Sequence, residues 1–403
     1  MYDAIVVGAR CAGSPTAMLL ARKGYRVLLV DKARFPSDTL SVHYIHQPGI
    51  ARLKRWGLLD AVIASNCPPV RTQRFDAGPF ALTGAPPPAS GVADGYSPRR
   101  TVLDKLLIDA AAAAGAEVRE RFTVDGLVMD GDRVTGVRGH TAGGAIVTEQ
   151  ARIVVGADGL HSRVARIVGA PAYEIRPALT CAYYAYWSDV PTAGVELYAR
   201  PDRMILAGPT NDHQTLVIIY WPQAAFREVR ADIAGNFLQA LDLAPGLSER
   251  VRAGRRAERF RGTADLPNLF RRPYGPGWAL VGDAGYHKDP ITAQGITDAF
   301  RDAELLAAAI DDGFSGRRTL ADALADYERR RNEAVMPMYE LTCQLAALQP
   351  PSPEMQRLFA ALRQDQTQTD RFFGAIAGTV PIAEFFAPEN VARITEAPAG
   401  VAA

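Results

Sequence analysis

The sequence has few of the residues that mark a metal site, a disulfide framework or a charged binding surface. Its 403 residues include only 4 cysteines, none with the CxxC spacing of a zinc or redox motif. No basic, apolar leader is visible at the N-terminus, so a reducing, cytoplasmic location is expected. Lysine plus arginine (45) nearly balance aspartate plus glutamate (44), which argues against nucleic-acid binding. No apolar run approaches the ~20 residues of a membrane span.

What the sequence does contain is a series of short apolar segments, each followed by glycine. Residues 4–7 and 26–31 are predicted as buried strands on either side of a helix over residues 14–23. A strand–helix–strand unit of about 30 residues implies a right-handed crossover and a parallel sheet. Residues 152–155 and 278–281 are predicted as two further buried strands.

The first glycine turn has the sequence of a phosphate-binding loop. Residues 8–13 (GARCAG) precede the predicted helix, whose N-terminal N–H groups can bind a pyrophosphate. Asp31 ends the second strand, where a carboxylate can accept hydrogen bonds from ribose hydroxyls. Arg10 replaces the second glycine of GxGxxG, so it either supplies a cation to the phosphates or marks a loop that has lost its ligand. The predicted dinucleotide-binding residues here are Gly8, Arg10, Cys11, Ala12, Gly13, Asp31 and Lys32.

Two later motifs favour flavin over nicotinamide as the bound dinucleotide. Residues 156–166 (GADGLHSRVAR) hold an Asp-Gly motif, and residues 282–296 (GDAGYHKDPITAQGI) hold a Gly-Asp motif. Residues 100–104 (RTVLD) match an Arg-x-x-Leu-Asp helix start. With these motifs in this order, the chain from about residue 3 to 345 resembles the FAD-dependent oxidoreductases of the para-hydroxybenzoate hydroxylase-like family, the group A flavoprotein monooxygenases and their relatives.

The resemblance implies an α/β fold and a set of cofactor-binding residues. A Rossmann-like FAD-binding domain is expected, interleaved with a mostly antiparallel substrate-binding sheet and followed by C-terminal helices. Asp283 is expected to accept from a ribityl or ribose hydroxyl and Arg100 to lie near the phosphates, while Asp158 serves the cofactors or only caps a helix. The helix after Pro290 is expected to direct its N-terminus at the flavin pyrimidine. The other implied residues are Gly159, Gly282, Gln294, Gly295 and Ile296.

Candidate catalytic residues come from two histidines and an aromatic-rich segment. His43 is expected beside the flavin or substrate, where a near-neutral pKa suits proton exchange, and His287 lies in the Gly-Asp loop; hydrogen-bonded loop histidines are the alternative. Residues 180–221 carry strand-like runs of tyrosine and tryptophan that either wall an apolar substrate pocket or fill a core. From this segment we predict Tyr184 and Tyr186 as catalytic. The predicted pocket residues are Tyr183, Trp187, Tyr220 and Trp221.

The predicted domains are discontinuous in the sequence. The FAD-binding domain is expected to comprise residues 1–75, 98–178 and 265–345. The substrate-binding domain is expected to comprise residues 76–97 and 179–264, with a C-terminal helical segment and tail over residues 346–403. Residues 79–98, rich in proline, glycine and alanine, are predicted to form a loop.

The function implied by the resemblance is that of an FAD-dependent monooxygenase. NAD(P)H and O2 are the expected co-substrates, and a flavin hydroperoxide the expected oxidant of an apolar, aromatic or polyketide-like small molecule of secondary metabolism. Residues 289–296 equally resemble geranylgeranyl-type reductases and some halogenases, so a reductase acting on a carbon–carbon double bond is the first alternative. Halogenation is less favoured because no WxWxIP-like sequence is present. A non-catalytic binding protein has only Arg10 in its support.

Overall fold

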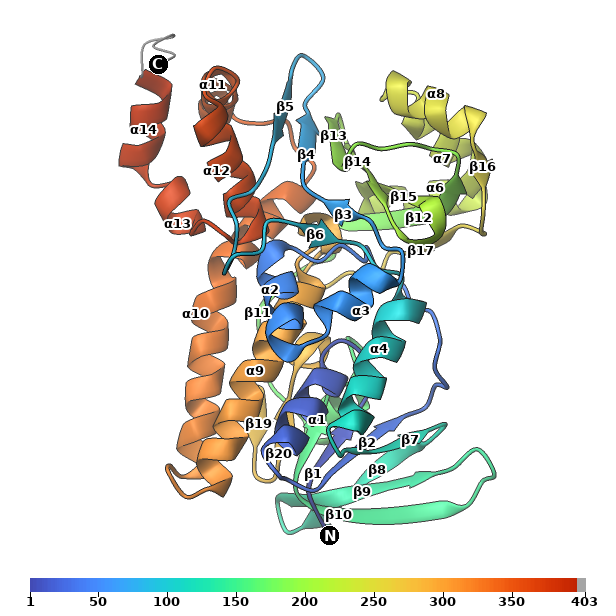
Figure 1. The fold of residues 1–403 in the computed structure, drawn as a ribbon, viewed down its shortest axis with the longest axis vertical. Coiled ribbons are helices and arrows are strands. Elements are labelled where there is room, and N and C mark those ends of the chain that lie inside the picture. Colours follow the sequence, from blue (N-terminus) through green and yellow to red (C-terminus); the bar gives the residue numbers. More distant parts are fainter. Residues whose placement is uncertain (397–403) are drawn as a thin grey trace.

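The computed structural model describes residues 1–396, so the end of the predicted tail lies outside the described part of the chain. Two large sheets organise the described residues, one above the other in Figure 1. The second sheet is formed by segments inserted between parts of the first. The predicted α/β class, with a Rossmann-like sheet, an interleaved antiparallel sheet and C-terminal helices, is confirmed.

The first sheet has the strand order β19-β20-β10-β1-β2-β7, extended by the ribbon β8-β9. Its parallel strands are β1 (Tyr2–Val7), β2 (Val27–Asp31), β7 (Glu117–Glu120), β10 (Ile146–Gly156) and β20 (Trp278–Leu280). Its antiparallel strands are β8 (Thr123–Asp130), β9 (Arg133–His140) and β19 (Tyr274–Gly275). The predicted buried strands are therefore neighbours in one sheet.

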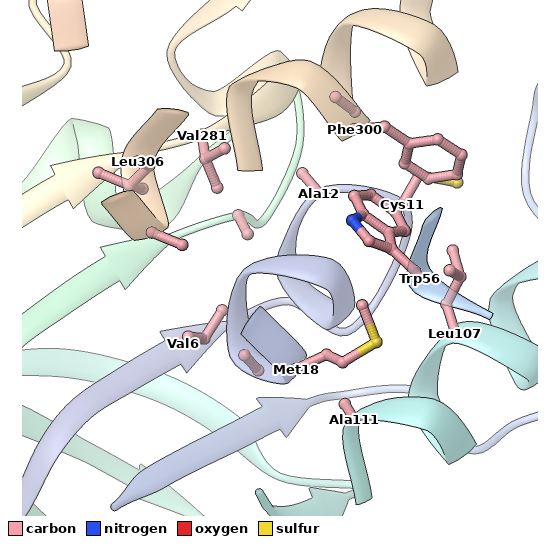
Figure 2. Packing of buried hydrophobic residues seen from close by; sticks show 14 of the residues in the cluster. Val6, Cys11, Ala12, Met18, Trp56, Leu107, Ala111, Val281, Phe300 and Leu306 are labelled. Atoms are coloured by element: carbon pink, nitrogen blue, oxygen red, sulfur yellow. The ribbon is translucent and has the colours of Figure 1, made fainter. Parts of the chain in front are cut away.

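Alternate residues of these strands face two different cores, as the two-residue period of a strand requires. On one face, Val6 of β1 packs with Met18, Leu107 and Phe300 from three covering helices (Figure 2). The helices of this layer are α1 (Gly13–Arg22), α2 (Gln47–Trp56), α4 (Arg100–Ala113) and α9 (Gly295–Phe314). The opposite face packs against the β8-β9 ribbon and α5 (Arg163–Ile167). The long helix α10 (Leu320–Ala346) lies along α9, and α3 (Leu59–Ala64) follows α2.

The second sheet has the order β16-β12-β15-β14-β13-β4-β5, with β17 also paired to β12. All its pairs are antiparallel except β13 with β4. Its strands are β4 (Gln73–Asp76), β5 (Ala81–Gly84), β12 (Thr180–Ser188), β13 (Val195–Arg200), β14 (Arg203–Pro209), β15 (Gln214–Pro222), β16 (Arg255–Arg256) and β17 (Arg261–Thr263). One face packs on α6 (Phe226–Ala231), α7 (Ile233–Leu241) and α8 (Pro245–Ala253), and the other faces the first sheet's helical layer.

The C-terminal helices cover an edge of the second sheet that was not expected to be a strand. They are α11 (Pro353–Leu362), α12 (Gln366–Ala377), α13 (Ile382–Phe385) and α14 (Pro388–Glu396). Phe359 and Phe372 pack on Phe75 of β4 and near Phe80 beside β5. The prediction of a loop over residues 79–98 is therefore wrong at β5, because residues almost 300 positions later in the chain bury this strand, and it is also wrong at the two-residue strand β6 (Gly95–Tyr96).

Small elements complete the fold. They are β3 (Pro69–Val70), β6 (Gly95–Tyr96), β11 (Ala172–Arg176), β18 (Asn268–Arg271) and β21 (Tyr286–His287), with short 3-10 turns at Asn211–His213, Gln223–Ala225, Gly282–Ala284 and Pro290–Thr292. Each helix within residues 1–396 is too short or too polar to cross a bilayer.

Candidate active site

A cavity of about 800 Å³ lies between the two sheets and is walled by three glycine-containing turns. These turns follow β1, β10 and β20, which are adjacent parallel strands and therefore end at the same edge of the first sheet. Ligands of open α/β sheets bind at such carboxyl ends. The three sequence motifs are thus brought to one site, although they are far apart in the chain.

Glycine is required in these turns for two different reasons. At Gly8 (φ +105°) a Cβ atom would overlap the carbonyl oxygen of Ala157, and at Gly13 it would overlap that of Gly8, so the protein's own packing excludes a side chain. At Gly295 a Cβ would meet no described atom within 4 Å. Gly295 lines the cavity, so the space beside it belongs to whatever the cavity holds.

Asp31 has the position expected of a ribose-binding carboxylate. Its two oxygens each accept a backbone N–H at 2.7 Å, one from Ala9 in the glycine turn and one from Ala33. Each oxygen keeps a second acceptor site, and the residue lines the cavity together with Lys32. Asp31 therefore both orders the phosphate loop and offers acceptors to a ligand.

Arg10 and Arg100 are held together by a fully buried carboxylate, Asp104. The Arg10 guanidinium forms an ion pair with Asp104 and donates to Ser37 Oγ at 3.0 Å. Arg100 donates to the same carboxylate through Nε and Nη2, at 3.0 and 3.1 Å. The Sγ of Cys11 lies 3.4 Å from it as well. This cluster places two cations in the cavity wall beside the glycine turn.

The two other motif aspartates differ in what they contact. Asp158 accepts from Ser162 Oγ at 2.5 Å and from the N–H of Arg163 at 2.7 Å, so it caps α5, the alternative role considered for it. The carboxylate of Asp283 lines the cavity and takes part in none of the hydrogen bonds or ion pairs within residues 1–396. Asp283 is the free acceptor, and Asp158 contributes mainly to the shape of the wall.

His43 is buried in the wall near the apolar part of the cavity. Its Nε2 hydrogen bonds with Tyr186 Oη, its Nδ1 has no partner within the described residues, and its φ of +66° is unusual for a side-chain-bearing residue. Burial, with the cations Arg100, Arg99 and Arg261 nearby, lowers the pKa of His43 well below 6.5. The prediction of a near-neutral pKa is therefore wrong, and the ring is neutral at physiological pH.

Tyr184 and Tyr186 lie on the cavity-facing side of β12. Tyr184 lines the cavity, and its Oη is buried without a hydrogen bond to any described residue. Tyr186 lies behind it, with its ring 4.2 Å from the guanidinium carbon of Arg99. Burial raises the pKa of both phenols, so both keep their protons at neutral pH.

Three of the four predicted pocket residues face the wrong way. Tyr183 and Trp187 alternate with Tyr184 and Tyr186 along β12, so they point to the opposite face and pack against α6 and α7. Trp221 lies in the same cluster. Their assignment to the wall of the flavin cavity is wrong. Tyr220 does face the first sheet's layer, but it is fully buried and hydrogen bonds to the carbonyl of Pro290 at 3.3 Å.

The segment before α9 supplies most of the remaining predicted residues. Pro290, Gly295 and Ile296 line the cavity, and so do Gly159 and Gly282. His287 also lines it, with its Nδ1 2.5 Å from the carbonyl of Pro267. Gln294 instead donates to the carbonyl of Ile376 at 2.6 Å, so its side chain fastens the start of α9 to α12.

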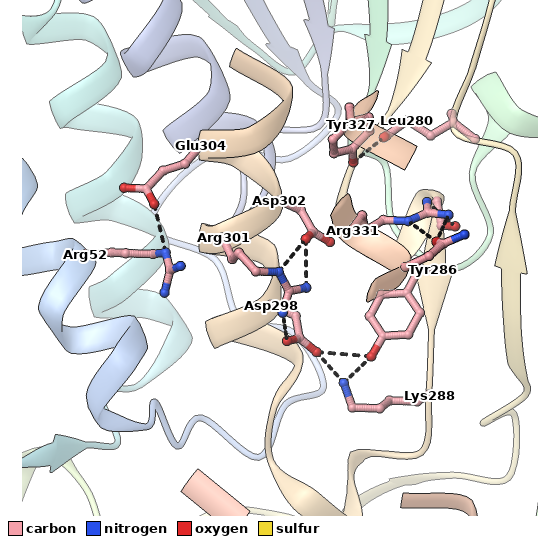
Figure 3. A network of polar contacts seen from close by, with 12 residues as sticks. Arg52, Leu280, Tyr286, Lys288, Asp298, Arg301, Asp302, Glu304, Tyr327 and Arg331 are labelled. Carbon is pink, nitrogen blue, oxygen red and sulfur yellow. Dashed lines mark hydrogen bonds and ion pairs between the residues drawn. The ribbon is translucent and has the colours of Figure 1, made fainter. Parts of the chain in front are cut away.

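A buried ionic network below the start of α9 was not predicted from the sequence. Lys288 is almost completely buried, lines the cavity and pairs with Asp298, which also accepts from Tyr286 Oη at 3.1 Å (Figure 3). The guanidinium of Arg301 forms ion pairs with both aspartates, at 2.8 Å from Asp298 and 2.7 Å from Asp302. Burial alone raises the pKa of Asp298, but Lys288 and Arg301 together lower it to about 2. Asp298, Arg301 and Asp302 lie three and four residues apart on α9, and Tyr286 and Lys288 precede this helix in the chain, so the helical spacing of the three charges is the one local signal of the network.

Another buried histidine, His46, for which the sequence predicts no role, gives a prediction for acid stability. It is buried, hydrogen bonds through Nε2 to the carbonyl of Thr292 at 3.1 Å, and burial lowers its pKa from 6.5 to about 4. The unfolded chain therefore binds more protons between these values, so stability is full above pH 6.5 and declines as the pH falls to 4. Burial of neutral His46 is expected to account for about 3 kcal/mol of that decline.

The measurement is urea unfolding of the wild type and of His46→Gln between pH 7.5 and 4.5. Glutamine keeps an N–H donor for Thr292 but does not titrate in this range. The variant should lose markedly less stability on acidification than the wild type. An identical decline in both proteins would show that His46 is not the responsible group.

The fold and the cavity define a dinucleotide-binding flavoprotein. A family model described as an FAD binding domain matches residues 1–342 of the chain. The protein belongs to this family, and it is an FAD-dependent oxidoreductase.

Relatives that match the chain are named for several different reactions. The chain is 27% identical over 346 residues to the digeranylgeranylglycerophospholipid reductase of Methanosarcina acetivorans, covering 83% of this chain and 81% of the relative. It is 27% identical over 348 residues to the tryptophan 2-halogenase of Chondromyces crocatus. This match covers 81% of this chain and 64% of the halogenase. The relatives agree on flavin but not on the reaction.

Solved structures show the same fold across this range of activities. The myxobacterial chondrochloren halogenase superposes with a TM-score of 0.80 at 22% identity, covering 98% of this chain and 96% of that one. A probable FAD-dependent monooxygenase of Pseudomonas aeruginosa superposes with a TM-score of 0.71 at 22% identity. This match covers 93% of this chain and 98% of the monooxygenase. These similarities establish the fold alone.

The residues of the cavity fit FAD. Asp31 and the turn at Gly8 suit the adenosine and pyrophosphate, the free carboxylate of Asp283 suits a ribityl hydroxyl, and the open face of Gly295 leaves room for a ring. The partial positive charge at the start of α9 suits the pyrimidine end of a reduced flavin.

Proposed function

We propose that the protein is a monooxygenase that takes electrons from NAD(P)H and uses O2 to oxygenate a compact, apolar, aromatic or polyketide-like molecule. The observation that carries this proposal is the apolar wall facing the start of α9. Ala182, Tyr184 and Ile218 of the second sheet pack in one apolar cluster with Val42 and Ala293, and all five line the cavity. Such a wall accommodates an apolar substrate and keeps water out of the site.

FAD, when bound, supplies the redox chemistry: it accepts electrons from the nicotinamide and activates O2. The chain's own contribution is to position the substrate in a dry compartment. Two buried polar atoms that have no hydrogen-bond partner among residues 1–396, Tyr184 Oη and His43 Nδ1, belong to cavity-lining residues. Since buried polar groups need partners, they favour a substrate with a hydroxyl or carbonyl group that pairs with them. The neutral His43 ring can either donate or accept at Nδ1, depending on its tautomer.

Reduction of a carbon–carbon double bond is the second candidate, favoured by the identity of 27% to reductases over 83% of the chain. The size of the cavity argues against a lipid substrate. About 800 Å³ has to hold FAD as well as the substrate, and sites for a single drug-sized ligand already occupy ~300–1,000 Å³. A small, compact substrate is therefore the better fit.

The test uses the FAD-loaded protein with NADH or NADPH, a panel of phenolic and polycyclic compounds, and ¹⁸O2. We expect at least one compound to accelerate NAD(P)H oxidation and to gain one ¹⁸O atom. Catalase and a measurement of hydrogen peroxide separate this coupled reaction from simple oxidase activity. Product that forms equally well without O2 would contradict the proposal, and anaerobic reoxidation of the reduced enzyme by an alkene would favour the reductase. A halogenated product that requires added halide would favour halogenation.

A further inference from the structure

A second groove opens beside the flavin cavity, at the edge of the second sheet. It has a volume of about 420 Å³ and is lined by Leu40, Tyr183, Arg259, Phe260, Arg261 and Gly262; we call it the arginine groove. Leu40 and Gly262 line both the groove and the cavity, so the two spaces share this part of their walls. A ligand bound in the groove would therefore lie next to a cofactor held in the cavity.

The backbone pairing explains how one edge of the sheet serves both spaces. Gly262 of β17 pairs with Tyr183 of β12, and Arg261 pairs with Tyr184. Tyr184 points into the cavity and Tyr183 points away from it, so the β12-β17 edge forms the partition between cavity and groove. Leu40 stands at the junction with 47% of its surface exposed, an apolar side chain that a bound ligand would cover.

The groove has a surplus of positive charge. Arg261 pairs with Asp38 at 3.0 Å and lies 3.8 Å from Glu258, and these two carboxylates also pair with Arg99. The negative charges of Asp38 and Glu258 therefore balance the positive charges of Arg99 and Arg261. Arg259 is exposed and has no carboxylate within ion-pair distance among residues 1–396, so its charge is uncompensated.

Further cations and aromatic rings belong to the groove wall or pack against its residues. The guanidinium of Arg256, which also has no acidic partner in the described chain, lies 4.5 Å from the centre of the Phe260 ring. Tyr183 stacks on Phe226, and Arg230 lies 5.9 Å from that ring. Guanidinium groups next to aromatic surfaces are suited to phosphates and planar bases.

We propose that the arginine groove binds the phosphate-bearing part of the nicotinamide donor, with Arg259 as its principal phosphate contact. This inference rests on the proposed function, which requires NAD(P)H. With FAD in the cavity, the dihydronicotinamide ring enters past Leu40 and Gly262, while the dinucleotide phosphates stay outside at the arginines. In this arrangement the groove determines the affinity for the donor, and the cavity determines the hydride transfer that oxidises it.

The test is anaerobic stopped-flow reduction of the FAD-loaded enzyme at increasing concentrations of donor. Arg259→Ala is expected to raise the apparent Kd for NADH or NADPH about tenfold, as for the loss of one charged hydrogen bond, and to leave the limiting reduction rate unchanged. Reduction by 1-benzyl-1,4-dihydronicotinamide, which carries no phosphate, should be unaffected. The matched control is Arg330→Ala on α10, an exposed arginine that lines neither the groove nor the cavity and whose loss should change the apparent Kd of neither donor.

Several results would overturn the proposal. An unchanged Kd for the natural donors in Arg259→Ala would exclude the groove as their site. An equal rise in the apparent Kd for the natural donor and for the phosphate-free donor would show that the substitution acts on the structure and not on phosphate recognition. A rise confined to the KM of the oxygenated substrate would assign the groove to that substrate. If the donor data are as expected but no substrate is oxygenated, the proposed function fails while the groove assignment stands.

Discussion

Replacing Gly295 with leucine is expected to weaken FAD binding by about 100-fold without destabilising the apo-protein. Gly295 begins α9 and lines the cavity, and a Cβ added there would meet no described atom within 4 Å. Leucine has a better helix propensity than glycine by about 1 kcal/mol, so the melting temperature of the apo-protein should stay the same or rise. The loss arises because the leucine side chain occupies volume that the cofactor needs. Flavin fluorescence titration and thermal unfolding of the apo-protein measure the two quantities.

Gly24→Ala is the matched control for this prediction. Gly24 also has nothing within 4 Å of an added Cβ, but its φ is +88° and it follows α1, away from the cavity. A left-handed alanine costs about 1 kcal/mol of stability, and FAD binding should be retained. Gly295→Leu is therefore expected to lose FAD affinity but not stability, and Gly24→Ala to lose stability but not FAD affinity. Wild-type affinity in Gly295→Leu would mean that FAD does not lie against the start of α9.

Asp298→Ala is expected to lower the free energy of unfolding by about 3–5 kcal/mol. The substitution removes the carboxylate that pairs with both Lys288 and Arg301, and all three side chains are largely buried. Two cations would then remain in a region of low dielectric constant, and among the described residues Arg301 would keep Asp302 as an acidic partner while Lys288 would have none. Chemical denaturation of the apo-protein measures the effect independently of FAD.

An exposed ion pair provides the comparison for Asp298. Glu333 pairs with Arg329 one turn away on α10 at 2.8 Å, and both side chains are about 60% exposed. Glu333→Ala should change stability by no more than about 0.5 kcal/mol, because water screens the pair. Similar small losses in both variants would show that the buried network contributes little to folding.

The sequence was most informative where local chemistry alone decides the structure. The glycine turn at Gly8, the carboxylate at Asp31 and the Gly-Asp motif at Asp283 each follow an apolar strand, and parallel strands bring their carboxyl ends together. That geometry follows from the order of elements in the chain. Knowledge of the individual partners was not needed to predict that these residues share a site.

The aromatic strands were less predictable because both faces of the second sheet are buried. The first eight residues of β12 are all buried, so hydrophobicity does not alternate and gives no sign of which residues face the cavity. Tyr183 and Tyr184 are indistinguishable by composition, yet they point to different cores. The Lys288–Asp298 pair escaped notice although its members are only ten residues apart, because the sequence does not show that the turn before α9 folds Lys288 back against this helix.

The order of strands in the first sheet has a consequence for how the protein is made. β1 lies between β2 and β10, and β10 lies between β1 and β20. The central strands β1 and β10 therefore gain their last neighbours only when segments much later in the chain have been synthesised. Synthesis at about 5–20 residues per second separates the turn at Gly8 from the turn at Gly282 by tens of seconds. During that time the nascent chain lacks part of the wall of the cavity. The complete site for the cofactor can therefore form only after most of the chain has been synthesised.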